Sequence, residues 1–205
     1  IPFLNALFTA TSASCVTGLV VYDTFTEFTL IGQLVILTLI QVGGLGFMTV
    51  AIEFSLASGR RIGLRERSVL SEAVGAQQMA GVVRFTRRIL KGTFYIEGFG
   101  AVILATRFIP VFGVPKGIWY AVFHSVSAFC NAGFDRLGTI EPSSSLVHFA
   151  NDPVIVITIA LLILIGGIGF LVWNDLYENG LHMKKLTLHS QVVLMATTWI
   201  TLIAT

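Results

Sequence analysis

Residues 8–19 read FTATSASCVTGL, and residues 123–134 read FHSVSAFCNAGF. At an offset of 115 residues the two stretches share five identities without a gap. The shared pairs are Phe8/Phe123, Ser12/Ser127, Ala13/Ala128, Cys15/Cys130 and Gly18/Gly133. The sequence therefore predicts an internal repeat, which has to be settled before any other feature of the chain is interpreted.

Each copy consists of a short apolar segment followed by a loop with a glycine. Residues 3–14 would rise about 18 Å as a helix and residues 117–130 about 21 Å, too little to cross a hydrocarbon core of about 30 Å. The loops that follow are residues 15–22 and 130–135. Non-helical backbone at membrane depth survives only where it is buried in protein or lines water. The pattern therefore predicts two re-entrant helices whose loops line an ion pathway.

The composition is that of a membrane protein. Hydrophobic residues make up 55% of the chain and charged residues 12%, about half the usual share in soluble domains. No charge lies in residues 28–52 or in residues 153–174, and each of these runs is long enough to span a bilayer. Residues 89–109 are expected to form another span, and a further one begins near Leu186. The predicted fold class is an all-α integral membrane protein with parallel helix–pore-helix–helix repeats and re-entrant filter loops.

The charges set the expected orientation. Ten of the 13 Lys and Arg residues fall in residues 60–91 and 184–185, which the positive-inside rule makes cytoplasmic. Because apolar spans flank both segments, a nucleic-acid-binding patch is a poor alternative. The basic connector could dock a cytoplasmic partner or rest on anionic lipid, or it could do no more than set the topology. The two cysteines occupy matching repeat positions, which argues against a disulfide framework.

A second repeated motif lies in the inner half of two of the expected spans. Residues 41–47 read QVGGLGF and residues 165–170 read IGGIGF, at an offset of 123 residues. Clustered glycines either let helices pack closely or mark a bend beside the pathway, and the sequence leaves both interpretations open. Glu97, the one internal acid of its span, is either a functional group or the partner of an arginine near the cytoplasmic face.

The two loops have the chemistry of a site for a bare monovalent cation. The candidate residues are Cys15, Val16, Thr17, Gly18, Cys130, Asn131, Ala132 and Gly133. Their side chains carry no fixed charge, so backbone carbonyl oxygens would replace the hydration shell of the ion. The C-terminus of each short helix adds the negative end of its dipole. The two glycines would supply the backbone freedom needed to aim several carbonyls the same way.

At these motifs the sequence resembles the potassium-translocating subunit of the Trk/Ktr/HKT cation transporters, and bacterial Ktr most of all. The resemblance is carried by CVTGL (15–19), QVGGLGF (41–47), CNAGFD (130–135) and IGGIGF (165–170), and by RIGLRER (61–67) with VVRF (82–85) in the connector. It covers nearly all 205 residues. The resemblance implies four repeats around one pore, with Gly18 and Gly133 as the filter glycines of the first two.

The resemblance also implies an arrangement of domains. Residues 1–58 would be repeat 1, residues 59–88 the cytoplasmic basic connector, residues 89–176 repeat 2, and residues 177–205 a cytoplasmic turn with the start of repeat 3. We interpret the chain as a piece of a longer protein that cannot conduct ions alone.

The resemblance implies partners as well. We expect a multi-pass protein of the cell membrane that works as a homodimer among lipid and transports potassium. It would need no cofactor, bind no nucleic acid and work with a cytoplasmic nucleotide-binding regulatory subunit.

Three alternative functions can be weighed against this one. A membrane-embedded enzyme could use Cys130, His124 and Glu97, but His124 and Cys130 are six residues apart and would face different sides of a helix. Cys15 has no histidine counterpart, because Thr9 occupies that position. A dinucleotide-binding domain fails because no strand precedes the glycines and their spacing differs from G-x-G-x-x-G. Another type of cation channel or transporter subunit is the third alternative.

Overall fold

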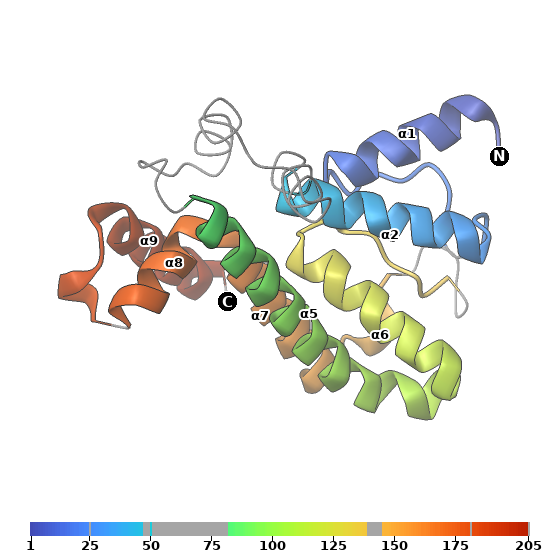
Figure 1. Cartoon of the computed structure of the whole chain (residues 1–205). Coiled ribbons are helices and arrows are strands. Elements are labelled where there is room, and N and C mark those ends of the chain that lie inside the picture. The colour runs from blue at the N-terminus through green and yellow to red at the C-terminus, as the bar shows by residue number, and fades with distance from the viewer. Residues whose placement is uncertain (25, 47–49, 51–81, 139–144, 181, 205) are drawn as a thin grey trace. The chain divides into compact units, whose positions relative to one another are not determined.

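The structure is a computed structural model that describes residues 1–24, 26–46, 50, 82–138, 145–180 and 182–204 (Figure 1). Within these ranges the chain is helical and forms no strand. The helices are α1 (Phe3–Ser14), α2 (Leu30–Leu45), α5 (Val82–Phe112), α6 (Val114–Phe129), η1 (Val147–Phe149), α7 (Pro153–Gly167), α8 (Phe170–Asn179), η2 (Met183–Lys185) and α9 (Leu188–Ala204). The expected all-α class is therefore confirmed for the described residues, while most of the predicted connector at 59–88 lies outside them.

The chain divides into two compact units. The first contains Ile1–Leu45 and Thr93–Gly166, and the second contains Gly46–Gly92 and Gly167–Thr205. The first unit holds both copies of the repeated stretch. In it α1 lies beside α2, and α2 lies beside α6, as Figure 1 shows.

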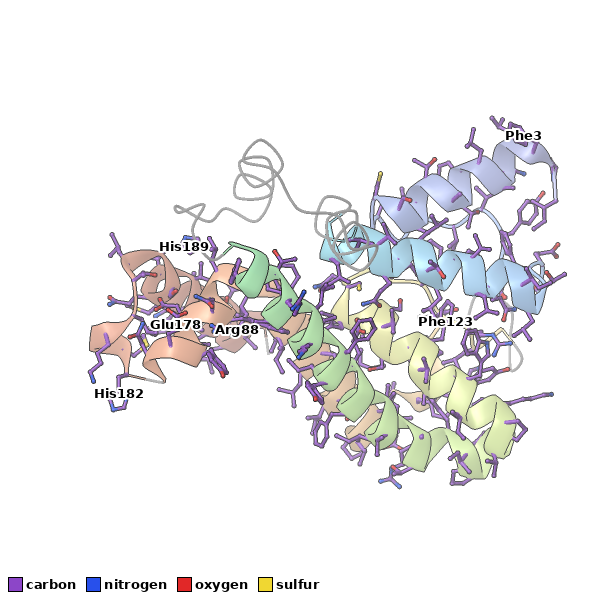
Figure 2. The ribbon with its side chains drawn as sticks, viewed as in Figure 1. Phe3, Arg88, Phe123, Glu178, His182 and His189 are labelled. Atoms are coloured by element: carbon purple, nitrogen blue, oxygen red, sulfur yellow. The ribbon has the colours of Figure 1, made fainter. Side chains whose placement is uncertain are left out.

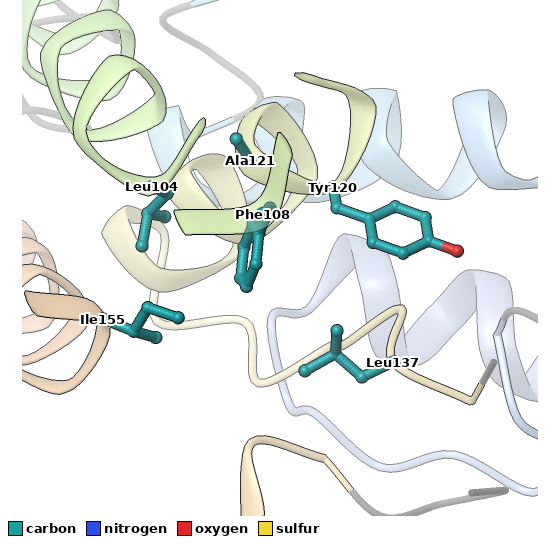
Figure 3. Close-up of a cluster of buried hydrophobic side chains, with 6 residues drawn as sticks. All are labelled: Leu104, Phe108, Tyr120, Ala121, Leu137 and Ile155. Carbon is teal, nitrogen blue, oxygen red and sulfur yellow. The ribbon is translucent and has the colours of Figure 1, made fainter. Parts of the chain in front are cut away.

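The core of the first unit joins α5, α6, the loop after α6 and α7. Six side chains with at most 1% exposure form it: Leu104, Phe108, Tyr120, Ala121, Leu137 and Ile155 (Figure 3).

A single residue, Gly113 with φ +80°, connects α5 to α6. Gly117 then lets α6 approach α5, because a Cβ there would lie 2.6 Å from the Cα of Ile109. This tight hairpin fixes where the second short helix begins.

The expected spans are only partly found as single helices. The segment Phe85–Phe112 of α5 is long and apolar enough to cross a membrane, and α7 and α8 qualify together only if they are counted as one bent span. Two more apolar helices, α2 and α9, are shorter. The span expected at 153–174 is interrupted: α7 ends at Gly167 and α8 begins at Phe170. The interruption coincides with Gly169, whose φ of +89° is incompatible with a right-handed helix.

In the second unit α8 is hydrogen-bonded to the start of α9 and to α5. Asp175 accepts hydrogen bonds from the backbone N–H and the hydroxyl of Thr187, both at 2.8 Å, and from Asn179 at 2.7 Å. Thr187 in turn caps α9, since its hydroxyl accepts the N–H of Ser190. Arg88 of α5 reaches Asn174 at 2.8 Å and Glu178 at 3.2 Å, and its guanidinium lies over the ring of Tyr177.

Candidate ion-binding loops

The helix α1 ends in a Schellman motif. The N–H of Thr17 donates to the carbonyl of Ser12 at 3.0 Å, and the N–H of Val16 donates to that of Ala13 at 3.3 Å. Val16 has φ +56°, the left-handed conformation that this ending requires. A β-branched residue seldom adopts such a φ, so the loop that follows α1 is strained.

The helix α6 ends in the same way. The N–H of Ala132 donates to Ser127 at 2.8 Å and that of Asn131 donates to Ala128 at 3.0 Å. Asn131 has φ +57°, within one degree of the value at Val16. Asparagine tolerates this conformation better than valine does. The repeat seen in the sequence is therefore also a repeat of backbone geometry, at the same offset of 115 residues.

Both loops place a second positive φ two residues further on. Gly18 has φ +74° and Gly133 has φ +70°. The two glycines also lie against each other, because a Cβ on Gly133 would be 3.5 Å from the Cα of Gly18. A Cβ on Gly18 would be 2.8 Å from the carbonyl oxygen of Ala132. The two predicted loops thus meet in space at their glycines.

The carbonyl oxygens of the eight candidate residues are not used within the described part of the chain. Those of residues 15–18 and 130–133 accept no hydrogen bond from any described residue. The flanking groups are held instead: the hydroxyl of Ser127 donates to the carbonyl of Phe134 at 2.5 Å, and the hydroxyls of Ser12 and Thr17 share a hydrogen bond of 2.8 Å. Each loop is therefore fixed at its edges, and its own carbonyls are left available.

Glycines of the repeated motif pack against the ends of the two short helices, where the loops begin. A Cβ on Gly43 would collide with the carbonyl oxygen of Ser14, the last residue of α1. A Cβ on Gly166 would collide with the carbonyl oxygen of Phe129, the last residue of α6. Since Ser14 and Phe129 are 115 residues apart, these are equivalent contacts. In each repeat a glycine lets the following helix touch the end of the short helix.

The same motif also ends helices. Gly46 follows the last residue of α2 with φ +82°, and Gly169 precedes α8 with φ +89°. The two interpretations that the sequence left open are both found, at different glycines. Gly43 and Gly166 provide close packing, whereas Gly46 and Gly169 mark breaks.

Glu97 does not pair with an arginine in the described part of the chain, contrary to one of the two predictions made for it. Its side chain is 4% exposed, and its carboxylate accepts hydrogen bonds from Gln41 Nε2 at 3.1 and 3.2 Å. Cys130 Sγ lies 3.9 Å from Glu97 Oε1. The acid therefore contacts the first residue of the second loop, Cys130. Its partners are an amide and a thiol because this part of α5 packs against α2 and α6.

Comparison with known proteins identifies the family of the chain. The family model described as the cation transport protein TrkH matches residues 1–201. The chain belongs to the TrkH family. The resemblance stated from the motifs is thereby confirmed, and membership places the chain among membrane cation transport proteins rather than enzymes.

Three relatives show how much of a TrkH-family protein is present. The potassium/sodium uptake protein NtpJ of Enterococcus hirae is 45% identical over 195 residues, which are 95% of this chain and 42% of the relative. The Ktr system potassium uptake proteins B of Bacillus subtilis and Vibrio alginolyticus are 40% and 39% identical over 98% of this chain, and over 44% and 43% of their own lengths. The chain therefore spans less than half the length of these relatives.

The enzyme alternative also lacks geometric support in this TrkH-family chain. His124 Nδ1 is 2.7 Å from the carbonyl of Tyr120, and its Nε2 accepts the backbone N–H of Arg136 at 3.3 Å. Cys130 Sγ meets Glu97 instead. His124 is therefore occupied by the backbone on both sides and does not serve as the base of a cysteine nucleophile.

Sequence reasoning assigned no role to Arg136. The side chain is 7% exposed, and its Nε donates to Gln33 Oε1 at 2.5 Å. Its guanidinium also lies 4.7 Å from the ring centre of Tyr120. The sequence showed that Arg136 lies close to the loop, three residues after Gly133, but nothing in it identified Gln33 as the partner.

Proposed function

We propose that this chain is part of the potassium-translocating subunit of a potassium uptake system. In this proposal the carbonyl oxygens of residues 15–18 and 130–133 form part of a selectivity filter for a bare monovalent cation. The observation that carries it is the meeting of two equivalent loops at Gly18 and Gly133, whose carbonyls accept no hydrogen bond from any described residue. The names of the relatives, which are potassium or potassium/sodium uptake proteins, support the choice of ion.

The backbone geometry supports carbonyl coordination. In an extended strand successive residues face opposite sides. A positive φ at every second residue, at Val16 and Gly18 and again at Asn131 and Gly133, departs from that alternation. Such a loop can present consecutive carbonyls to one side. Two loops surround an ion only in part, so the remaining oxygens would come from the rest of a longer protein.

We further propose a multi-pass subunit of the cell membrane in which the two short helices are re-entrant. The helices carry exposed apolar side chains that suit contact with lipid, among them Phe3, Ile31, Phe94 and Trp199. Figure 2 labels Phe3 on α1. We also propose that the subunit forms homodimers and works with a cytoplasmic nucleotide-binding regulatory subunit. The name "Ktr system", printed for three of the relatives, supports the idea of further components.

Ion uptake by the full-length protein that contains this chain tests the proposal. The protein is reconstituted into liposomes, and uptake of potassium and of sodium is measured over a range of concentrations, with empty liposomes as the control. We expect saturable potassium uptake that sodium competes for only weakly. Liposomes with well-folded protein that take up no monovalent cation, or that take up sodium and not potassium, would contradict it.

Charge reversal at the start of α5 is expected to separate regulation from selectivity. Changing Arg84, Arg87 and Arg88 to glutamate should weaken the response of uptake to the regulatory subunit or disturb topology, because these residues continue the basic connector. The ratio of potassium to sodium uptake should stay at the wild-type value. Arg107→Glu, which breaks an exposed ion pair with Asp152 at the other end of α5, is the matched control for an α5 charge change. A changed uptake ratio in the triple variant would contradict this separation.

A further inference from the structure

One helix contacts the second loop on both sides of its glycine. Gln33 and Gln41 of α2 are eight residues apart, which is about 12 Å along a helix axis. Gln33 reaches Arg136, three residues after Gly133. Gln41 reaches Glu97, whose carboxylate meets Cys130, three residues before Gly133. We call this pair of contacts the glutamine clamp.

At the Glu97 end of the clamp, the side-chain amide of Gln41 is hydrogen-bonded to a carboxylate. Gln41 Nε2 donates to both oxygens of Glu97, at 3.1 and 3.2 Å, and the Sγ of Cys130 lies 3.9 Å from Oε1 of the same group. The hydroxyl of Ser125 in α6 also donates to the backbone carbonyl of Glu97 at 2.6 Å. A buried carboxylate is costly unless such partners are in place. The position of Cys130 is therefore tied to that of α2 through Glu97.

At the Arg136 end of the clamp, both the nitrogen and the oxygen of the Gln33 side-chain amide form hydrogen bonds. Its Nε2 donates to the carbonyls of Thr24 at 3.3 Å and Phe28 at 2.9 Å, and its Oε1 accepts from Arg136 Nε at 2.5 Å. Gln33 is 2% exposed. A glutamate there would keep the acceptor for Arg136 but would turn unpaired oxygen toward two carbonyls. Only an amide satisfies all three contacts.

The two glutamines of the clamp have no counterparts in the second copy of the repeat. At the offset of 123 residues that relates the glycine motifs, Gln33 corresponds to Val156 and Gln41 to Leu164. These apolar side chains offer no hydrogen bond. The amide contacts are therefore specific to α2 and the second loop, and they are not a general feature of helix packing in this fold.

We propose that Gln33 and Gln41 are positioning residues that hold the second loop on both sides of Gly133 and thereby set the discrimination between potassium and sodium. This proposal rests on the proposed function of the loops. Arg136 is hydrogen-bonded to Gln33 of α2, and Cys130 contacts Glu97, which Gln41 of α2 holds. A shift of either contact would therefore move the carbonyls of residues 130–133. Neither glutamine supplies a carbonyl to the site. Their effect on ion preference would therefore come through the positions of these loop carbonyls.

The test uses uptake ratios of the full-length protein in liposomes. Gln41→Glu places two carboxyl groups face to face, and Gln33→Glu removes two donors, so each is expected to lower the potassium-to-sodium ratio by about threefold to tenfold. The exchange Gln41→Glu with Glu97→Gln reverses donor and acceptor and is expected to restore the ratio. Thr38→Val is the matched control, because Thr38 is an exposed residue of α2 whose hydroxyl donates to the carbonyl of Leu34 in the same helix.

Thermal unfolding of each purified variant is measured beside the ratio, because a merely structural role would lower stability and leave the ratio unchanged. Well-folded Gln41→Glu and Gln33→Glu variants with the wild-type ratio would overturn the clamp. So would an exchange variant as impaired as Gln41→Glu. If Gln41→Glu yields no folded protein, the exchange variant and Gln33→Glu decide by the same ratio. Gly133→Ser separates the two proposals: if it shifts the ratio and the glutamine variants do not, the clamp fails and the filter stands.

Discussion

Gly18→Ala in the full-length protein is expected to reduce the potassium-to-sodium uptake ratio more than Gly133→Ala does. At both positions alanine is strained, because φ is +74° and +70°. At Gly18, however, the added Cβ would also lie 2.8 Å from the carbonyl oxygen of Ala132, one of the oxygens proposed to bind the ion. At Gly133 the nearest atom is the Cα of Gly18 at 3.5 Å, an ordinary contact.

The expected magnitudes follow from this difference. A left-handed residue other than glycine costs about 1–3 kcal/mol, and displacement of a backbone carbonyl comes in addition at Gly18. We therefore expect a loss of at least about tenfold in the ratio at Gly18. Gly133→Ala and Gly133→Ser should also lower the ratio, each by less than Gly18→Ala. Initial rates of potassium and sodium uptake into liposomes measure both. Unchanged ion preference in well-folded variants would contradict the filter assignment, and the reverse order would contradict the contact with Ala132.

The sequence was sufficient to locate the two loops, because the repeat is local and ungapped. The short helices expected at 3–14 and 117–130 correspond to α1 (Phe3–Ser14) and α6 (Val114–Phe129). The second begins earlier than expected because Gly113 turns the chain directly after α5. Both helices end where the repeated Cys-x-x-Gly predicts a loop. Identical spacing was a reliable guide here, since the backbone hydrogen bonds at the two helix ends are also identical in pattern.

Contacts between the repeats could not be predicted in this way. Gln33 and Arg136 are 103 residues apart, and Gln41 and Glu97 are 56 residues apart. Helical periodicity indicates which face of a helix is buried, but it does not identify the partner across the interface. Sequence reasoning therefore found no partner for Arg136. The arginine expected as one possible partner of Glu97 was a reasonable choice on charge alone, but the protein stabilises this acid with the amide of Gln41 instead.

The interruption between α7 and α8 lay at the limit of sequence reasoning. A run of 22 residues without charge favours an unbroken span, and three glycines in it favour a bend. Hydropathy does not decide between the two, because it averages over a window longer than the break. The positive φ at Gly169 decides it, and the equivalent φ at Gly46 places a break at the same motif position after α2.

Gly43→Ala and Gly166→Ala are expected to destabilise the full-length protein strongly. In each, the Cβ would overlap a backbone carbonyl oxygen, that of Ser14 or of Phe129, at the last residue of a short helix. A backbone atom cannot rotate away as a side chain can, so the helices must separate. Overpacking of this kind costs typically about 1–3 kcal/mol, and we expect the upper end because the obstacle is rigid.

Gly98→Ala is the matched control for these two variants. Gly98 also lies within a helix, α5, but a Cβ there would meet nothing within 4 Å. Alanine in a helix interior is better than glycine by about 0.5–1 kcal/mol, so this variant should be as stable as wild type or more stable. The three variants are compared by thermal unfolding of the detergent-solubilised protein, with size-exclusion chromatography as the measure of folded protein. If Gly43→Ala and Gly166→Ala unfold at the same temperature as Gly98→Ala, the motif glycines do not provide the close packing against α1 and α6 on which the placement of both loops depends.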